Sequence, residues 1–207
     1  MTIKRPAKTT KTLCVGVTGH RPNRMPESQW DRIKRDLATV MAEVEAIHVN
    51  RRFVLLSGIA EGADRLAAFA ALGRGWSLRS ILAFHRTRFE ADFPEPFAIG
   101  EFRALLAASE AVEEPRKGAQ VRRPEDGYDA VARKLIASSD VLIAVWDGEG
   151  SRGKGGTVDV IEQAHAKGIP VIWVHARKTQ PPRRLRAPDA ASNMKRPGIR
   201  GSRTPAA

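Results

Sequence analysis

Three segments of this sequence share one pattern, in which a short run of consecutive, mainly apolar residues leads into a glycine-containing turn and then into a helical stretch. The runs are Leu13–Thr18, Phe53–Ser57 and Val141–Trp146. A strand that is apolar at successive positions is buried on both of its faces. Helices between such strands favour a parallel sheet. The pattern therefore predicts an α/β fold, with a mainly parallel sheet and helices on both faces.

The remaining elements follow from apolar spacing and turn residues. Further strands are expected at 77–84 and 170–175, and helices at 27–47, 63–72, 99–109, 128–138 and from 157 to about 168. Apart from its one helix, the stretch 85–127 is expected to be irregular. In parallel α/β sheets the ligand lies beyond the carboxyl ends of the strands. All three glycine turns are expected at that edge, which makes it the predicted site.

The net charge of +12 is distributed unevenly along the chain. Of the 35 Lys and Arg residues, 4 lie in residues 1–12 and 9 in residues 176–207, whereas Asp189 is the only one of the 23 acidic residues in either segment. Residues 13–175 therefore hold 22 basic and 22 acidic residues and carry no net charge. The positive excess, which by itself would suggest nucleic acid, belongs to the two ends of the chain.

The two ends also lack the apolar residues that a folded segment needs. Residues 176–207 contain five of the 13 prolines and only three large aliphatic side chains, Leu185, Met194 and Ile199. Such a segment cannot bury enough apolar surface to offset the entropy lost on ordering. We therefore predict a disordered basic N-terminus at 1–12, one folded domain at 13–175 and a disordered, basic, proline-rich C-terminal tail at 176–207.

Several classes of protein are excluded by what the sequence lacks. No apolar run approaches the roughly 20 residues of a membrane helix, and the first residues have no signal-type apolar stretch. A single cysteine, Cys14, cannot form an internal disulfide or a multi-cysteine zinc site. His48, His85, His165 and His175 show no metal-ligand spacing. We expect a cytoplasmic protein without a membrane segment, a metal or a resident cofactor.

The first glycine turn, at residues 16–22, reads GVTGHRP and does not match the GxGxxG dinucleotide fingerprint. Its two glycines would let the backbone approach a ligand. Thr18 offers a hydroxyl group, and His20 and Arg21 are suited to meet a phosphate. The alternative is a tight turn that places the histidine and the arginine at the surface.

The second glycine turn, at residues 57–65, reads SGIAEGADR and passes from a strand into a helix. The first N–H groups of that helix would attract an anion. Glu61 and Asp64 are candidates for hydrogen bonds to a ribose. The alternative is that both acidic residues favour the start of the helix whatever binds nearby.

The third glycine turn, at residues 147–157, reads DGEGSRGKGGT and opens a helix. Five glycines in ten residues indicate that the backbone comes close to another group, for which a phosphate is the natural candidate. Residues 148–155 fall one residue short of a Walker A motif, because Gly155 stands where that motif needs Ser or Thr for Mg²⁺. The alternative is a surface loop. Trp146, just before the turn, is suited to stack on a base or to pack in the core.

Taken together, GVTGHRP at 16–22, SGIAEGADR at 57–65 and WDGEGSRGKGGT at 146–157 resemble the SLOG superfamily. This Rossmann-like group is named for the DNA-processing protein DprA and the Lonely Guy phosphoribohydrolases. The resemblance implies a Rossmann-like fold with a pocket for a nucleotide or nucleotide-derived ligand, and it also implies a homodimer. Its branches include sensors of bacterial conflict systems, hydrolases that cleave a base from a ribose phosphate, and the single-stranded DNA binder DprA.

The hydrolase branch carries a pattern similar to PGGxGTxxE, whose last residue is catalytic. The matching stretch here is 155–160, which lacks the proline and places Val160 at the glutamate position. Asp159 lies one residue earlier, about 100° away around a helix, and Glu162 lies two residues later. The departure argues against hydrolysis. Asp159 is expected to hydrogen-bond ligand hydroxyls or to cap the helix.

We therefore expect a binding or sensor domain for a nucleotide-like ligand, with its phosphate on the N–H groups of residues 155–157. The candidate binding residues are Gly16, Thr18, Gly19, His20, Arg21, Ser57, Gly58, Glu61, Gly62, Asp64, Trp146, Asp147, Gly155, Gly156, Thr157 and Asp159. One alternative is an N-glycosidic hydrolase of the nucleoside monophosphate phosphoribohydrolase type, for which Glu61, Asp64 and Asp159 are the candidate catalytic groups. The second alternative is single-stranded nucleic-acid binding through the basic tails.

Overall fold

The computed structural model of this chain describes residues 11–91, 93, 95–119, 123–150 and 155–186. These residues form one sheet in the strand order β4-β3-β2-β1-β5-β6-β7. The strands are β1 (Thr12–Gly19), β2 (Arg52–Ser57), β3 (Ser77–Ile81), β4 (Ser109–Glu113), β5 (Val141–Trp146), β6 (Val171–His175) and β7 (Arg183–Leu185). Neighbouring strands are parallel except β7, which runs antiparallel to β6. The predicted Rossmann-like α/β fold is confirmed.

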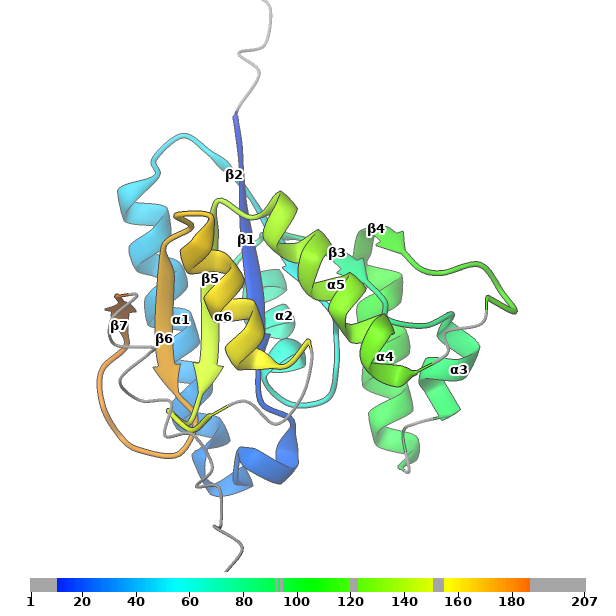
Figure 1. The fold of residues 1–207 in the computed structure, drawn as a ribbon. Coiled ribbons are helices and arrows are strands. Elements are labelled where there is room, and N and C mark those ends of the chain that lie inside the picture. The colour runs from blue at the N-terminus through cyan, green and yellow to red at the C-terminus, as the bar shows by residue number, and fades with distance from the viewer. Residues whose placement is uncertain (1–10, 92, 94, 120–122, 151–154, 187–207) are drawn as a thin grey trace, which may run out of the picture.

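Helices cover both faces of the sheet (Figure 1). One face carries α1 (Trp30–Ile47) and α2 (Ala63–Gly73), with α4 (Pro96–Ala108) packed beside α2. The other face carries α5 (Pro124–Ser138) and α6 (Thr157–Ala166). Short turns of helix lie at η1 (Pro22–Arg24), η2 (Glu27–Gln29) and α3 (Arg86–Ala91). The sheet therefore separates two apolar cores, one under each layer of helices.

The apolar spacing of the sequence accounts for this packing. The buried side chains of α1 follow one another at helical spacing along a single face, namely Ile33, Leu37, Val40, Met41 and Val44. Every residue of β5 is buried, as expected of a central parallel strand covered by helices on both sides. None of the helices in the described residues is both long and apolar enough to cross a membrane.

The position of the site is set by the two strands at the centre of the sheet. From β1 the chain builds outward through β2, β3 and β4 on one side, and then returns to add β5 and β6 on the other. In an open parallel sheet, such a reversal of strand order leaves a crevice beyond the carboxyl ends of the two strands. Gly19 at the end of β1 is paired with Val145 of β5. The loops after these two strands therefore flank the crevice.

Two elements of the stretch expected to be irregular, 85–127, are regular in the structure. Strand β4 has mostly exposed side chains at the edge of the sheet, and α3 is a single short helix with one buried residue, Phe89. An edge strand with little burial carries no apolar run, and a six-residue helix is too short to show a helical repeat of apolar residues. Neither element could therefore be recognised in the sequence. Residues 120–122 lie outside the described part of the chain.

The strand β7 corrects the expected end of the folded domain at residue 175. Its Leu185, one of the few aliphatic residues of the predicted tail, pairs with Val171 and is buried. The Arg183 guanidinium lies 4.8 Å from the centre of the Trp173 ring. Three residues are too few to show a strand pattern in the sequence. The disorder expected for 1–10 and 187–207 stays a prediction, because those residues lie outside the described part.

A substitution at Gly16 tests how tightly α5 packs on the central strand β1. A Cβ atom at this position would overlap Ser139 Oγ and would lie 2.9 Å from Leu135 Cδ2. We expect Gly16→Ala to lower the free energy of unfolding by about 1–3 kcal/mol, because the added methyl group overfills a packed contact. Urea denaturation followed by circular dichroism measures the change.

Gly100→Ala is the matched control, because Gly100 lies in α4 with open space around its Cβ position. That substitution should raise stability by up to about 1 kcal/mol, the difference in helix propensity between the two residues. Equal stability of Gly16→Ala and the wild type would show that α5 does not pack on β1 in this way.

Candidate functional site

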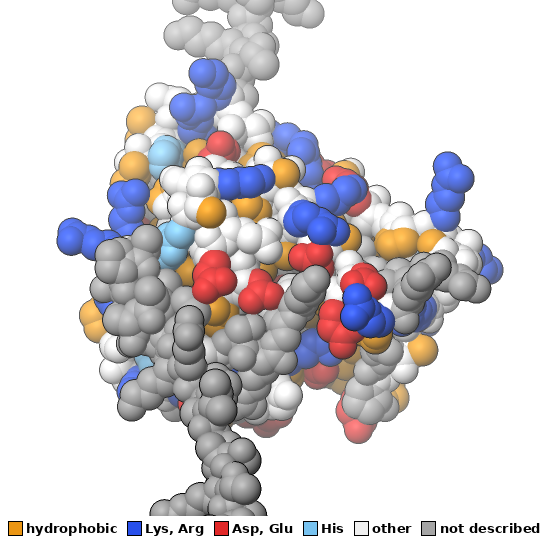
Figure 2. Space-filling view, viewed as in Figure 1, with side chains coloured by type: hydrophobic (Ala, Val, Ile, Leu, Met, Phe, Trp, Pro, Cys, Tyr) orange, Lys and Arg blue, Asp and Glu red, His pale blue; other side chains and the backbone are white. Residues whose placement is uncertain are grey.

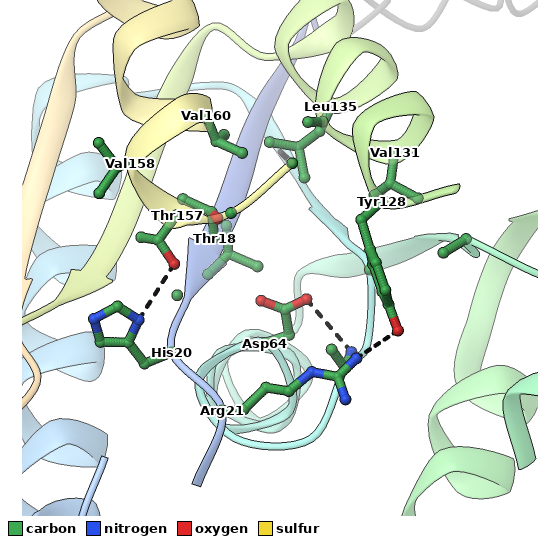
Figure 3. A pocket seen from close by; sticks show the side chains of 18 of the residues that line it. Thr18, His20, Arg21, Asp64, Tyr128, Val131, Leu135, Thr157, Val158 and Val160 are labelled. Atoms are coloured by element: carbon green, nitrogen blue, oxygen red, sulfur yellow. Dashed lines mark hydrogen bonds between the residues drawn. The ribbon is translucent and has the colours of Figure 1, made fainter. Parts of the chain in front are cut away.

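A cavity of about 440 Å³ lies at the carboxyl ends of β1 and β5. Its lining comes from the end of β1 and the loop after it, the loop before α2, the first turns of α2 and α6, and one face of α5, together with Ala83 after β3 and Phe89 of α3. Figure 3 shows His20 and Thr157 on one side of this pocket and Arg21, Asp64 and Tyr128 on the other. The pocket thus occupies the crevice that the strand order creates.

The start of α6 forms one wall of the pocket. The helix is preceded by Gly156, an N-cap residue with no side chain to accept a hydrogen bond from the first turn. The first N–H groups of a helix have no acceptor within the helix and attract anions. Thr157 adds a buried hydroxyl group to the same wall. This arrangement suits a phosphate or a carboxylate group.

Gly155 fixes the direction in which α6 begins. Its backbone has a positive φ of 71°, and a Cβ atom there would lie 2.7 Å from the backbone of Tyr128 on α5. The Gly155 N–H donates to Asp159 Oδ2 at 2.9 Å. A residue with a side chain would be strained by both the φ angle and the contact. The glycine therefore lets the start of α6 lie directly against α5.

Beside Thr157 lies a buried polar cluster made of His20, Asp147 and Arg24. His20 Nδ1 lies 3.5 Å from Thr157 Oγ1, and His20 Nε2 lies 2.8 Å from Asp147 Oδ1. Arg24 donates from Nε and Nη2 to the Asp147 carboxylate at 2.7–3.0 Å. Glu149 N–H also donates to Asp147 Oδ1, at 3.0 Å. The cluster holds the imidazole of His20 at the pocket wall.

The cluster also sets the charge states of its members. Burial lowers the pKa of His20 despite the neighbouring Asp147, so the imidazole is neutral at pH 7. Burial alone would raise the pKa of Asp147, but the contact with His20 and the hydrogen bonds from the Glu149 N–H and Arg24 outweigh it and lower that pKa. Asp147 is therefore a buried carboxylate that stays ionised.

The backbone of His20 is held between β5 and α2. Its N–H donates to the Val145 carbonyl at 3.0 Å, and its carbonyl accepts from the Ala63 N–H at 3.1 Å. Gly62 allows this contact, because it has a positive φ of 100° and a Cβ atom there would lie 2.6 Å from the His20 carbonyl oxygen. The loop after β1 is thus fixed to the first turn of α2.

The opposite side of the pocket joins Arg21, Asp64 and Tyr128 (Figure 3). Arg21 Nη2 donates to Tyr128 Oη at 2.6 Å. The Ala60 N–H donates to Asp64 Oδ2 at 3.4 Å. Burial raises the pKa of Asp64 to about 7, although the Ala60 N–H and Arg21 counteract it. The pocket also has an apolar lining, formed by Val17, Ala83, Phe89, Val131, Ala132, Leu135, Val158 and Val160.

Comparison with known proteins identifies the fold. No protein-family model matches the sequence, and no curated protein matches it either. The structure matches DNA processing protein A (DprA) from Streptococcus pneumoniae with 20% identity and a TM-score of 0.55, over 78% of this chain and 50% of that chain. DprA from Helicobacter pylori, described for its single-stranded DNA binding mode, matches with 20% identity and a TM-score of 0.51, over 79% and 65% of the two chains.

This chain shares the Rossmann-like fold of the two DprA structures. The resemblance expected from the three glycine-rich motifs is thus confirmed at the level of the fold. The chain spans half the length of the S. pneumoniae protein and about two thirds of the H. pylori protein.

The Rossmann-like fold brings residues from all three glycine motifs into one pocket. Of the predicted binding residues, those that line it are Thr18, Gly19, His20, Arg21, Gly58, Asp64, Gly155, Gly156 and Thr157. They come from segments far apart in the sequence, and the parallel order of β2, β1 and β5 places them together. Residues 151–154, which include the lysine of the Walker-like stretch, lie outside the described part of the chain.

Other predicted binding residues support the pocket from outside its lining. Gly16 and Gly62 provide space where α5 packs on β1 and where α2 meets His20. Ser57 Oγ accepts from the Ile59 N–H at 3.0 Å, which shapes the loop before α2. Asp147 orients His20, and Asp159 accepts a hydrogen bond from the Gly155 N–H.

Two predicted residues lie further from the pocket. Trp146, predicted to stack on a base or pack in the core, is fully buried, with its ring centre 5.5 Å from that of Trp173. Glu61 precedes α2 and is absent from the pocket lining. Of the three candidate catalytic carboxylates, Asp64 is therefore the one that lines the pocket. In the described residues, no group of three or more His, Cys, Asp or Glu side chains is placed to hold a metal ion.

Sequence reasoning missed the contribution of α5. Tyr128, Val131 and Leu135 line the pocket from one face of this helix. Their spacing of three and four residues was a signal of a shared face. It did not indicate which neighbour that face would meet, because an apolar helical face packs on a core far more often than on a ligand. Arg24 was missed because no motif marks its contact with Asp147.

The substitution Arg24→Met tests how much the cluster of His20, Asp147 and Arg24 contributes to the stability of the fold. The side chain of Asp147 is 1% exposed, so removing its guanidinium partner leaves a buried carboxylate with fewer donors. We expect the free energy of unfolding at pH 7 to fall by about 3 kcal/mol. The pKa of Asp147 is lowered in the folded state, so its stabilisation is complete above the ordinary carboxyl pKa and is lost as pH falls through the lower folded value. The deficit of the variant should therefore shrink in acid.

The control is Arg133→Met, which breaks the exposed Arg133–Asp129 pair on α5. An exposed pair contributes within about 1 kcal/mol. Chemical denaturation at several pH values compares the two variants. A loss for Arg24→Met no larger than that for the control would contradict the role given to the cluster.

Proposed function

We propose that this chain binds a nucleotide-like ligand, with a phosphate group at the start of α6 and the rest of the ligand toward α5. The observation that carries the proposal is the composition of the pocket. An anion-attracting helix start with the Thr157 hydroxyl lies at one end, and an apolar wall lies between it and a second polar group. A ligand that fits must combine a negative group, an apolar or aromatic part and hydroxyl groups.

The polar residues opposite α6 suit the sugar of such a ligand. The Asp64 carboxyl group and the Arg21 guanidinium face the pocket together. A carboxylate accepts hydrogen bonds from the hydroxyl groups of a ribose, as in dinucleotide-binding folds. The base would then lie against Val131 and Leu135 of α5, where the lining offers aliphatic side chains.

The charges around the pocket favour a small nucleotide over a nucleic-acid strand. A strand is bound by several cations that follow its backbone. Here Arg21 donates to Tyr128, and Arg24 is paired with Asp147. The face shown in Figure 2 carries both basic and acidic side chains among the described residues, and the acidic ones gather around its middle. Binding of single-stranded nucleic acid through the basic ends stays a prediction, and deleting 187–207 tests it without removing β7.

The proposal predicts that Gly156→Asp abolishes ligand binding without unfolding the protein. The backbone of Gly156 is extended, with φ of −77° and ψ of 171°, and Asp and Asn are both favoured at an N-cap. Asp places a negative charge where the phosphate is proposed, and Asn has the same shape without that charge. Unliganded melting temperatures of both variants should equal or exceed that of the wild type.

Thermal-shift titration with millimolar AMP, ATP, ADP-ribose and cyclic dinucleotides measures the effect, because a ligand that binds only the folded state raises the melting temperature. At least one compound should stabilise the wild type, and none should stabilise Gly156→Asp. Gly156→Asn caps the same N–H groups without a charge, so it should weaken the response without abolishing it. The proposal fails if no compound stabilises the wild type, or if the Asp variant responds as strongly as the Asn variant.

One observation favours a second candidate function, the hydrolysis of an N-glycosidic bond. Asp64 combines a place in the pocket lining with a pKa raised to about 7 by burial. A carboxyl group with a pKa near neutrality serves both acid and base steps. In its ionised form it would stabilise the ribosyl cation that develops as the base leaves and water adds.

This candidate predicts release of free base from a nucleoside 5′-monophosphate. Chromatography should detect the base with the wild type, and Asp64→Asn should lower the rate by about 100-fold or more, the usual contribution of a general acid or base. Asp159→Asn should keep most of the rate, because Asp159 accepts a hydrogen bond from Gly155. Absence of base release by the wild type, or an equal loss in both variants, would exclude hydrolysis by Asp64.

A further inference from the structure

His20 is a buried titratable group that faces the proposed phosphate site. It is 5% exposed and lines the pocket, with Nδ1 toward the Thr157 hydroxyl and Nε2 toward the Asp147 carboxylate. The Asp147 carboxylate, 2.8 Å from Nε2, favours the tautomer of the neutral imidazole that carries its proton on Nε2. Nδ1 then presents a lone pair to the pocket. A phosphate oxygen can approach that nitrogen only if a proton lies between them.

The charged groups around His20 do not supply a surplus of positive charge. Arg21 and Arg24 follow β1, whereas Asp147 and Glu149 follow β5. Three further carboxyl groups belong to the helices packed around the site, namely Asp64 of α2, Glu125 of α5 and Asp159 of α6. Acidic groups therefore outnumber basic ones. A proton on His20 would reduce the repulsion between these groups and a phosphate that carries two negative charges.

The surroundings of His20 are suited to hold that charge. Asp147 lies 2.8 Å behind the ring and is itself fixed by Arg24, so an imidazolium would have a carboxylate partner in place. The backbone of His20 is bonded to both β5 and α2, and its ring lies between Asp147 and Thr157. Protonated, it would donate from Nδ1 into the same space as the Thr157 hydroxyl and the start of α6.

We propose that His20 makes this pocket specific for a terminal phosphate, a phosphomonoester, by taking up a proton that lies between Nδ1 and the phosphate when the ligand binds. The inference rests on the proposed function and deepens it. The second ionisation of a phosphomonoester has a pKa near 6, so its dianion attracts a proton strongly. A phosphodiester keeps a single negative charge and attracts the proton less.

Proton uptake fixes the expected dependence on pH. Where the free imidazole and the free phosphate are both deprotonated, binding takes up about one proton, and affinity falls about tenfold for each unit that pH rises. Asp64 must be separated from His20 in this measurement, because its pKa of about 7 lies in the same region. Asp64→Asn removes that group and should leave the proton uptake in place, whatever it does to affinity.

Isothermal titration calorimetry at pH 8 tests the proposal with the four ribonucleoside 5′-monophosphates and their 5′-phosphate methyl esters. Titrations in buffers with different ionisation enthalpies report the number of protons taken up. For the wild type and Asp64→Asn we expect about one proton per monophosphate bound and at least tenfold weaker binding of the methyl ester. His20→Gln retains a polar side chain but cannot take up a proton. It should show no proton uptake and should bind each monophosphate and its methyl ester equally well.

The possible outcomes separate the two proposals. Absence of binding by all four monophosphates overturns the proposed function and the role of His20 with it. Binding without proton uptake, uptake that persists in His20→Gln, or equal binding of the methyl esters overturns the role of His20 alone. If His20→Gln shows no cooperative melting transition, His20→Asn replaces it. If both variants fail to fold, the proposal is tested on the wild type and Asp64→Asn alone. The two measurements are then the buffer dependence of the binding enthalpy and the difference in affinity between each monophosphate and its methyl ester.

Discussion

The buried carboxylate of Asp147 is the contact on which the geometry of the site depends. The strands β1 and β5 end beneath the pocket, and beyond their ends the sheet no longer holds the chain. Asp147 binds Arg24 of η1 and contacts His20 of the loop after β1, so it ties the loop after β5 to the loop after β1. A buried ion pair adds little stability over an apolar pair, but it requires one geometry. Because His20 contacts the same carboxylate, the position of its imidazole depends on that geometry.

The sequence predicted the scaffold well, because parallel strands buried on both faces leave a strong signal. The glycine motifs predicted the edge at which the pocket lies, since glycine is informative wherever backbone must approach closely. They did not separate glycines that face the pocket from those that give space to packing, as Gly16 and Gly62 do. The wall formed by Tyr128, Val131 and Leu135 depends on which helix lies beside which strand end, and a single sequence carries no record of that contact. Strand β7 was missed because its stability comes from pairing with β6.

The charge of the chain and the chemistry of the pocket are separate properties. The net charge of +12 arises from the ends of the sequence. The pocket contains several carboxyl groups and two arginines, Arg21 and Arg24, each of which is bonded to a neighbouring side chain. The attraction for an anion that we propose at this site would come from peptide dipoles and hydrogen-bond donors within a few ångströms, which a count of charged residues does not report. The same distinction separates a site for a small phosphorylated molecule from a surface for a polymer.

The order of the strands also determines when the pocket can exist. Strands β1 to β4 and the helices α1, α2 and α4 are all complete by Glu113, and each of these strands pairs with a neighbour in the sequence. The pocket, however, needs β5 to dock on β1, a pairing that joins residues far apart in the sequence, and it needs α6 to lie against α5. Contacts between residues distant in sequence form slowly. A nascent chain that has emerged only as far as β4 therefore lacks the pocket, and ligand can bind only once synthesis has passed α6.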